Sequence, residues 1–542
     1  MGGVLKRPTM IKRDDVKGSA VLLPLGLLMG LLWGCGDRDH IRIADRDAYQ
    51  ILDDKWDASF GSQSNYRIMD TPALPGDITS DRSLSNYGTL TLPRSVALAT
   101  AHNHLYQRQR ESLYRQALDL RLSRHEFENL FFGGGGAGLH GDDRDEVLGA
   151  EANIGVNRLL HDGTRIGARV TLAWVDILSG NLQGGLHSIL GVTVVRPLLR
   201  GASRDVVMEG LTQAERDTLY EIRRFNRFRK TFVVGVITEY YRILLLGQRA
   251  THAGENANAL RQLHDRTEKL VAAGRIPLHE LNRIHQEVLQ AQNAQLRAQR
   301  LYAEALDAFR VTLNVSGTAK FRLDEGEFST LRRAQMVLPA FDEREVIAAA
   351  LSRRLDLANL ADQVIDAERK VAVAEDQLRA ELNLVAGAVL PSSKLGDRAR
   401  LQPYKNEYGL GLEVDLPFDR LAEETVHRKT QIALMESRRE YEQYSDLISV
   451  EIRKAHRDLT EARDRHSLQT ESLSLVEKRL TGTTKLLALN RISTRRVLRT
   501  LEDYHQAKDA DAAALVNYAV AALNFYRDTG ILKVQPDGMW KL

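Results

Sequence analysis

His279 and Glu280 open the stretch HELNRIH (279–285), which comes close to a zinc-protease motif. That motif needs a second histidine four residues after the first, so that both bind Zn²⁺ from one helix face while the glutamate acts as general base. Position 283 holds Arg283 instead, and a third ligand is not evident. The spacing therefore excludes this zinc site, and we expect no metal and no cofactor.

The run GGGGAG (133–138) is a second candidate for chemistry, because glycine-rich loops can bind phosphate. It lacks the Gly-Lys-Ser/Thr of a phosphate-binding loop, and no predicted strand leads directly into it. We interpret it as a flexible joint. Serines scattered near histidines do not define a catalytic triad without geometry. We expect no enzyme.

Cys35 is the only cysteine, which excludes an internal disulfide or a cysteine metal cluster within one chain. Basic residues and then the apolar run 20–33 precede it, in the order of a secretory signal. That run is too short to span a membrane as a helix. We predict a signal peptide over 1–35, and the start could be Met1 or Met10.

The tetrapeptide LWGC (32–35) resembles the lipobox of bacterial lipoproteins, in which the cysteine is lipidated and becomes the mature N-terminus. Cys35 is therefore the predicted lipid-attachment site. Trp33 departs from the pattern, where a small or branched residue is usual, and an ordinary signal with a chance cysteine is the alternative. Gly36 stands where many inner-membrane lipoproteins have aspartate, so we expect export to the outer membrane.

Composition favours long helices, since 27% of the 542 residues are charged, 43% are hydrophobic and only 12 are proline. The net charge is +3, from 75 basic and 72 acidic residues that interleave along the chain. No basic block forms, so we expect no nucleic acid partner.

Periodicity divides the first half of the chain. Residues 36–90 are polar and aperiodic and are predicted to form an extended leader, and helical patterning then begins near Leu92. Residues 164–174 alternate as a two-faced strand. One face is Ile166, Ala168, Val170, Leu172 and Trp174, and the other is Arg165, Gly167, Arg169 and Thr171.

Helical spacing then runs from 202 to 272, which corresponds to a helix of roughly 100 Å at about 1.5 Å per residue. The stretch AAGRIP (272–277) breaks it, and a second helix is predicted from Leu278 to Leu313. A compact globular core does not need a helix of that length.

The same order of elements then repeats. Strands are predicted at 381–390 and 408–418, a long helix from about Arg420, and a last helix to about Arg527. A shift of 216 superimposes identical residues along the helices: Ala272 and Ala488, Arg275 and Arg491, Ile276 and Ile492, Tyr302 and Tyr518, Phe309 and Phe525. The strand phrases LGVTVVRPLL and LGLEVDLPFD repeat at an offset of 220.

These patterns give the expected domain organisation. It is a first structural repeat over 91–315, a linker or equatorial segment over 316–341, a second repeat over 342–530 and a tail over 531–542. Each repeat supplies about two strands and a helical hairpin. Four strands cannot close a barrel alone, and open edges have no hydrogen-bond partners in lipid.

The second strand of the second repeat alternates sharply. Its apolar face is Tyr408, Leu410, Leu412, Val414 and Leu416, and its polar face includes Glu413 and Asp415. One lipid-facing and one water-facing side suit a barrel shared with other copies. A half-buried sheet in a soluble protein fits the same alternation.

From Leu92 to Leu532 the chain resembles the TolC-type outer-membrane efflux proteins. The resemblance rests on the strand ends VVRPLL and VDLPF, the turns AAGRIPLHEL and ALNRISTRRVL, and the closing ALNFYRDTGIL, in this order. It implies a mainly α fold with membrane β. Three copies would form a channel-tunnel, each giving four strands to a twelve-stranded barrel and long α-hairpins to a periplasmic tunnel.

The resemblance further implies a passive exit duct of a tripartite efflux pump or type I secretion system. Its partners would be a second and third copy, a periplasmic adaptor, an inner-membrane pump and outer-membrane lipid, in a Gram-negative-type bacterium. The adaptor-contacting tips would be Gly274, Arg275 and Ile276, and Asn490, Arg491 and Ile492. The alternatives are a structural periplasmic coiled-coil lipoprotein that links membrane and cell wall, and the adaptor itself, which the tandem hairpins disfavour.

One departure from the family concerns charge at the tip. Many members have aspartates where this chain has Arg496 and Arg499. If these arginines face the lumen, three copies make a positive constriction that prefers anions when closed. Glu280 would pair with Arg495 or Arg496 and latch the tip. A solvated arginine on the outer face is the alternative.

Overall fold

The computed structural model describes residues 37–63, 65–68, 86–141, 146–177, 185–333, 342–391, 406–416, 418–489, 491–535 and 540–541. The predicted signal, Cys35 and the tip residue Asn490 lie outside these ranges.

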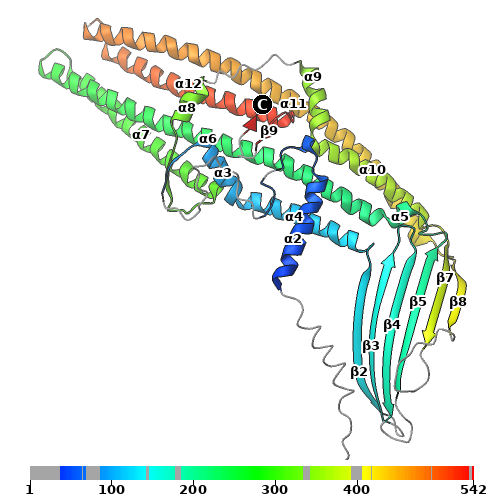
Figure 1. Ribbon diagram of the computed structural model, residues 1–542. Coiled ribbons are helices and arrows are strands. Elements are labelled where there is room, and N and C mark those ends of the chain that lie inside the picture. The colour runs from blue at the N-terminus through cyan, green and yellow to red at the C-terminus, as the bar shows by residue number, and fades with distance from the viewer. Residues whose placement is uncertain are drawn as a thin grey trace, which may run out of the picture.

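Four long helices make the body of the molecule (Figure 1). They are α6 (Glu209–Ala272), α7 (Leu278–Leu313), α11 (Leu421–Ala488) and α12 (Thr494–Asp528). The bounds of α7 are those predicted, whereas α6 begins at Glu209, after the short α5 (Arg204–Val207). At 64 and 68 residues, α6 and α11 are each about 100 Å long. None of the described helices is both long enough and apolar enough to cross a membrane.

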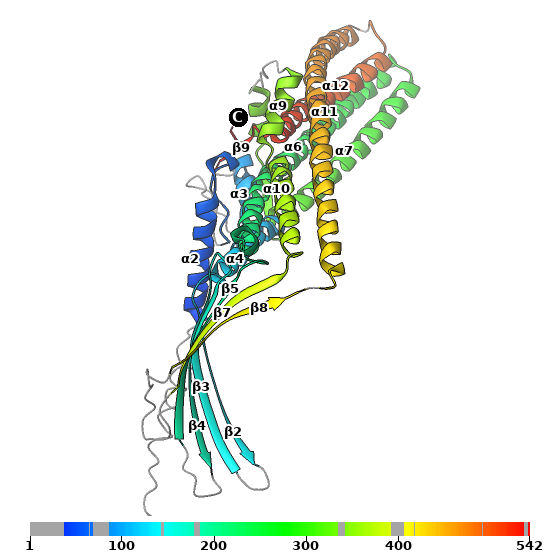
Figure 2. The ribbon, with the colours of Figure 1, turned by 90° about the vertical axis from the view of Figure 1, so that its right-hand side faces the viewer.

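Helices α6 and α7 form one antiparallel hairpin, α11 and α12 form the other, and α6 packs on α12. The main hydrophobic core lies where the hairpins meet and includes Val233, Ile237, Tyr240, Phe309 and Leu523. Both hairpins turn at the end of the molecule opposite the sheet (Figures 1 and 2).

Shorter elements surround this core. They are α3 (Leu92–His102), α4 (His104–His125), α8 (Gly326–Arg333), α9 (Glu343–Arg353), α10 (Leu355–Asp376) and the 3₁₀ turn Ala58–Phe60. Two small sheets also form. Strand β1 (Asn86–Leu90) runs parallel to β6 (Lys320–Leu323), which is distant in the chain, and β9 (Lys533–Val534) pairs with the nearby β10 (Trp540–Lys541). The linker is thereby tied to the last residues of the leader, directly before the first repeat.

The extended leader predicted for 36–90 is wrong over its first part. Asp37–Lys55 forms helix α2, which buries Ala48, Ile51 and Leu52 against α4 and α6. Their spacing of three and one residues places them on one face of a helix. So short an apolar stripe, among many charges, was not recognised as helical in the sequence.

One six-stranded antiparallel sheet stands at the end of the helical body. Its strands are β2 (Leu130–Gly141), β3 (Glu146–Leu159), β4 (Arg165–Ile177), β5 (Gly185–Pro197), β7 (Glu381–Pro391) and β8 (Glu407–Asp415), in that order across the sheet. The first repeat therefore gives four strands and the second gives two. The prediction of four strands per chain is wrong.

The glycine-rich run 133–138 is a strand and not the predicted flexible joint. It belongs to β2, whose twelve residues pair without interruption with 146–157 of β3. Glycine has a low intrinsic preference for strands. The backbone hydrogen bonds with β3 stabilise the extended conformation here. The composition of 133–138 alone does not predict a strand.

Candidate functional site

The sheet has two chemically different faces, because paired residues on neighbouring antiparallel strands point the same way. Following the register from Val170 in β4 gives a mainly apolar face across all six strands, on which Arg158, Ser188 and Arg196 also lie. Its apolar members include Phe131, Ala137, Leu139, Ala150, Ala152, Ile154, Val156, Ile166, Ala168, Val170, Leu172, Trp174, Leu190, Val192, Val194, Leu382, Leu384, Ala386, Ala388, Leu390, Tyr408, Leu410, Leu412 and Val414.

Much of this apolar face is uncovered within one chain. The side chains of Tyr408 and Phe131, on opposite edges, are 84% and 79% exposed, and Ile154 lies 65% exposed between them. Soluble proteins expose single apolar side chains scattered over their surface, but rarely a contiguous apolar patch that crosses six strands. This face needs a nonaqueous neighbour.

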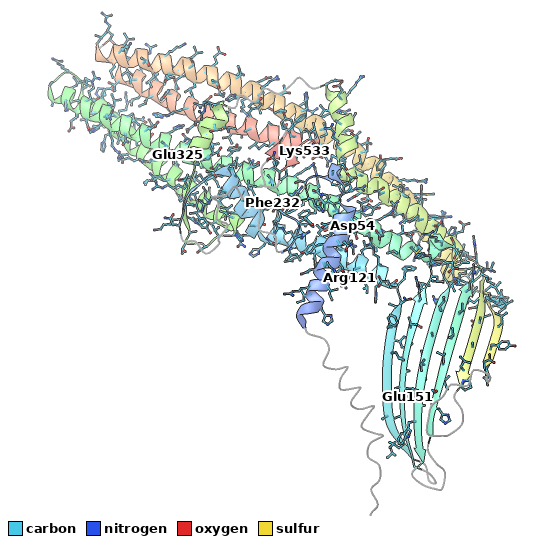
Figure 3. All side chains as sticks on the ribbon, in the orientation of Figure 1. Asp54, Arg121, Glu151, Phe232, Glu325 and Lys533 are labelled. Carbon is cyan, nitrogen blue, oxygen red and sulfur yellow. The ribbon has the colours of Figure 1, made fainter. Side chains whose placement is uncertain are left out.

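The opposite face is more polar than the first, although Phe132, Ile189, Val195, Val385 and Val389 also lie on it. It carries Glu151, labelled part-way along β3 in Figure 3, with Asn153, Asn157, Arg169, Thr171, Thr193, Glu413 and Asp415. Glycines occupy many of its other positions. Such a face suits water, so the sheet can separate lipid from an aqueous space.

Both edges of the sheet are open in the described part of the chain. Strand β2 pairs only with β3, and β8 pairs only with β7. All nine residues of β8 are exposed. Unpaired edge groups are tolerated in water but not in lipid, so the sheet must acquire edge partners if its apolar face meets hydrocarbon.

The two hairpin turns share two backbone hydrogen bonds at an offset of 216. In the first, the amides of Ala273 and Arg275 donate to the carbonyls of Lys269 and Leu270, at 3.1 and 2.9 Å. The amides of Leu489 and Arg491 donate to Lys485 and Leu486, at 3.3 and 3.0 Å. Gly274 adopts φ +69°, the left-handed conformation that ends a helix and favours glycine.

The described tip residues predicted to contact an adaptor thus lie at the far ends of the hairpins. Gly274, Arg275 and Arg491 are exposed, and Ile276 and Ile492 are half-buried. Their accessibility agrees with a docking role, which stays a prediction.

Glu280 and Arg496 occupy equivalent places in the two repeats. The Glu280 amide donates to Pro277 at 3.1 Å, and the Arg496 amide donates to Ser493 at 3.0 Å. Glu280 pairs with Arg283 at 3.3 Å on its own helix. Among the described residues no ion pair joins Glu280 to Arg495 or Arg496, so the predicted latch is not formed within one chain.

The tip arginines point away from the packed side of α12. Thr494, Val497 and Thr500 are buried, while Arg495, Arg496 and Arg499 are exposed. Arginine in the first turn of a helix opposes the helix dipole and costs about 0.3–1 kcal/mol. Helix stability therefore does not explain the arginines at 495 and 496.

A polar seam between α6 and α12 was not predicted from the sequence. His252 Nδ1 lies 2.6 Å from Asp509 Oδ1, and Lys508 Nζ lies 2.6 Å from Glu255 Oε2. His505 lies beside them, and burial lowers the pKa of its imidazole. The partners lie about 250 residues apart in the chain, so no short sequence motif could predict their contact.

A second polar network ties the α9–α10 junction to α11. Arg354 is nearly fully buried, donates to Asp356 at 2.7 Å, and pairs with Glu451. Tyr444 donates to the same Asp356 carboxylate at 2.9 Å. Burial opposes ionisation of Asp356, but the positive charges of Arg354 and Arg227 and the hydrogen bond from Tyr444 outweigh it and lower the pKa to about 2.

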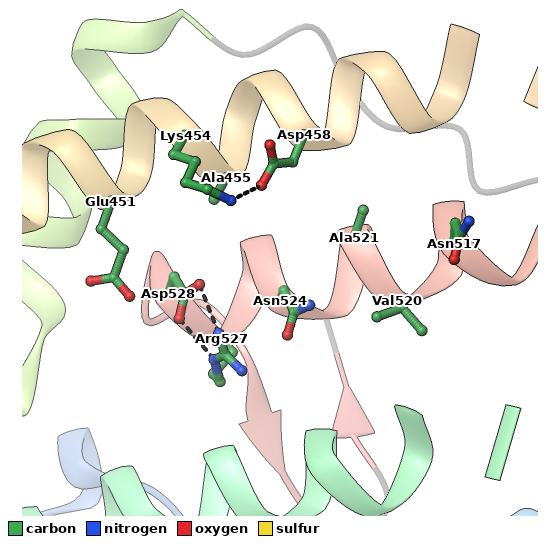
Figure 4. A pocket seen from close by; sticks show the side chains of 10 residues that line it. All are labelled: Glu451, Lys454, Ala455, Asp458, Asn517, Val520, Ala521, Asn524, Arg527 and Asp528. Carbon is green, nitrogen blue, oxygen red and sulfur yellow. Dashed lines mark hydrogen bonds and ion pairs between the residues drawn. The ribbon is translucent and has the colours of Figure 1, made fainter. Parts of the chain in front are cut away.

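A polar hollow of about 360 Å³ lies next to this network, between α11 and α12 (Figure 4). Its charged groups are all in ion pairs: Lys454 with Asp458, Arg527 with Asp528, and Glu451 with Arg354 outside the hollow. The described residues around it show no isolated nucleophile or base, and we assign the hollow no chemistry.

The described residues also bring together His264, Asp265 and Glu268, whose ligand atoms lie within 4.8 Å of one another. The two carboxylates are exposed on one helix face. His279, from the near-miss zinc motif, is exposed and lies 3.7 Å from Glu280. Neither grouping has the geometry of a built metal site.

No protein-family model matches the chain, and no curated protein matches it in sequence. Solved structures do match over nearly its whole length. The channel CusC is 14% identical, with a TM-score of 0.60 over 85% of this chain and 98% of that one. The CmeC outer-membrane channel of Campylobacter jejuni is 13% identical, with a TM-score of 0.57 over 88% and 91%.

The open-state MtrE outer-membrane channel of Neisseria gonorrhoeae is 11% identical, with a TM-score of 0.58 over 86% of this chain and 96% of that one. At this level of identity the likeness concerns the fold. The chain has the fold of these outer-membrane channels, mainly helical with an antiparallel sheet, which confirms the predicted fold class.

Proposed function

We propose that this protein is the outer-membrane exit duct of a tripartite efflux pump or type I secretion system. Three copies would form a passive channel-tunnel whose sheets cross the outer membrane and whose helices extend into the periplasm. The observation that carries this proposal is the six-stranded sheet, which has one apolar face, one polar face and two open edges.

The chemistry of the two faces supports a wall between lipid and water. The apolar face would contact hydrocarbon, where Tyr408 and Leu410 lose their exposure to water. Removing apolar surface from water is favourable by about 25 cal/mol per Å². The polar face would line the lumen, and copies paired edge to edge would satisfy the backbone groups of β2 and β8.

The long helices are suited to carry the duct from the outer membrane through the periplasm. Helices of about 100 Å carry the tips far from the sheet, where an adaptor and an inner-membrane pump could reach them. We propose that Gly274, Arg275, Ile276, Arg491 and Ile492 contact the adaptor, together with Asn490. We further propose that Arg496 and Arg499 line the closed tip as a positive ring, and that Glu280 latches it to Arg495 or Arg496 of a neighbouring copy.

Lipid attachment at Cys35 would anchor the chain as a lipoprotein. The alternative, a coiled-coil spacer between membrane and cell wall, needs no sheet of this kind, so the uncovered apolar face disfavours it.

The test is the mass and shape of the detergent-extracted particle, by light scattering and negative-stain microscopy. The proposal expects a three-chain rod with a hollow end view, and discrete ion conductance in planar bilayers. A monomer, or a thin rod without a lumen, would reject it in favour of the spacer.

A further inference from the structure

We propose that each copy gives six strands, so that three copies close a ring of eighteen strands and not twelve, with β2 of one copy pairing with β8 of the next. This inference rests on the proposed trimeric duct. It changes the width of the membrane pore and names the surfaces through which the copies join.

The directions of the strands allow neighbouring copies to pair. The six strands alternate, since every neighbouring pair in the sheet is antiparallel. Strand β2 leaves the helical body after α4, and β8 returns to it before α11. An even number of alternating strands therefore presents β8 antiparallel to β2 of the next copy, so the closed ring is antiparallel throughout.

The two unpredicted strands carry the same alternation as the other four. Phe131 and Leu139 in β2 and Ile154 in β3 lie on the apolar face and are 62–79% exposed. Asn153 and Asn157 of β3 lie on the polar face. The β2–β3 hairpin thus has the lipid-facing and water-facing sides of a barrel wall.

The two open edges fit one another. On the apolar face, β8 presents the bulky row Tyr408, Leu410 and Leu412, which is 65–84% exposed. Strand β2 presents Gly133, Gly135 and Ala137 on the same face. Large side chains on one edge strand cover glycines on its neighbour and stabilise the pairing. The occupant of each edge is therefore a second copy of this chain.

The register between the two edge strands follows from the pairing inside one sheet. Directly paired residues connect Leu130 of β2 with Gly409 of β8, through Asn157, Gly167, Thr193 and Gly387. Strands in a barrel tilt by about 35–45° and lie about 4.8 Å apart, with a rise of about 3.3 Å per residue. Over six strands this tilt shifts β2 of the next copy along the strand direction by about 6–9 residues relative to Leu130.

Only an even offset keeps apolar residues on one face. Gly409 then lies opposite Gly136 or Gly138 of the next copy. By the same register, Leu410 lies opposite Gly135 or Ala137.

The pore that results is wide. At about 40° tilt, twelve strands give a backbone diameter of roughly 24 Å and eighteen give roughly 36 Å. Glycines occupy eleven described positions of the polar face, which leaves room in the lumen: Gly134, Gly136, Gly138, Gly149, Gly155, Gly167, Gly185, Gly191, Gly387, Gly409 and Gly411. The membrane section therefore admits bulky water-soluble cargo, and size selection falls to the helical tips.

Two measurements test the ring. The first is disulfide cross-linking of Leu410→Cys combined with Ala137→Cys or with Gly135→Cys, scored as covalent dimers and trimers after oxidation. Leu410→Cys with Ala386→Cys is the matched control, because these residues pair within one chain and should give only monomers. Leu410→Cys alone reports any disulfide to Cys35, the only native cysteine.

The second measurement is the strand count in an end view of the unaltered particle by electron cryomicroscopy, which needs no variant to fold. Eighteen strands, with cross-links between β2 and β8, support the inference. A trimer of twelve strands that still conducts ions overturns the wider ring and leaves the duct standing. A particle that is not a trimer overturns both.

Discussion

Nδ1 of His252 on α6 lies 2.6 Å from Oδ1 of Asp509 on α12, and this contact joins the two helical hairpins across their seam. His252 is buried there, and the neighbouring pair Lys508–Glu255 bridges the same helices. If the second hairpin moves away from the first to widen the tip, both contacts must break. The seam therefore stabilises the packed arrangement of the two hairpins over one in which they separate.

Replacing His252 with alanine should favour opening. A hydrogen bond to a charged group contributes about 1.5–3 kcal/mol, which corresponds to a shift of roughly 10–150-fold in the closed-to-open ratio. Open probability in planar bilayers measures it. Asp509→Asn should act similarly, and the double variant should be less than additive. Arg300→Ala, which breaks an exposed pair on α7, is the control and should leave gating unchanged.

His505 should make the protein less stable in mild acid. Burial lowers the pKa of His505 below its ordinary value of 6.5, and its two ring nitrogens are buried without hydrogen-bond partners among the described residues. Below pH 6.5 the unfolded chain gains a proton that the folded chain resists, so stability falls until the folded pKa is reached.

His505→Gln should remove part of that loss. The measurement is Tm between pH 5 and pH 8 for both proteins. Equal Tm differences at every pH would show that His505 does not cause the acid sensitivity.

The Arg354 network should be a main support of the α9–α10 junction. Arg354→Ala leaves the carboxylates of Asp356 and Glu451 without their shared cation, at about 2–4 kcal/mol after allowing for their partial exposure. Arg453→Ala, which breaks an exposed pair with Glu343, should cost at most about 1 kcal/mol. Thermal unfolding of the two variants would compare them, and equal Tm losses would contradict the buried role.

The same network predicts behaviour in strong acid. Because the pKa of Asp356 is lowered to about 2, its ionised carboxylate contributes stability above its ordinary pKa of 3.8. That contribution is lost as the pH falls from 3.8 toward 2. Asp356→Asn should be less stable than the parent at pH 6 and should approach it near pH 2.

Gly155 should not tolerate a larger side chain. A Cβ there would overlap the ring of Phe132 and lie 2.7 Å from the carbonyl oxygen of Ala168. Gly155→Val should therefore reduce the yield of folded oligomer, by overpacking of about 1–3 kcal/mol per chain. Gly191→Ala is the matched control, because a Cβ meets nothing within 4 Å there. Gel mobility before and after heating measures the folded fraction.

Arg496→Asp and Arg499→Asp should reverse the ion preference of the closed tip if these arginines face the lumen. Reversal potentials under a salt gradient would move from anion toward cation preference. Arg428→Asp, far from the tip on α11, is the control. Unchanged potentials in the tip variants would place both arginines on the outer surface.

The sequence alone determined the elements that depend on local patterns. Helix α7 has its predicted bounds, because apolar spacing near 3.6 and the turn residues at 272–277 act within a few residues. The repeat at 216 likewise predicted two equivalent turns, and their backbone hydrogen bonds coincide at Arg275 and Arg491.

Only the tertiary structure decided the rest. Strand β2 forms because all twelve residues of 130–141 pair in register with β3, which the low strand preference of glycine does not predict. His252 and Asp509 meet because two helices pack side by side, 257 residues apart in the chain. The conformational preferences of residues act over a few positions in the chain. The number of strands, the contacts between hairpins and the open sheet edges depend instead on which distant segments hydrogen-bond with one another.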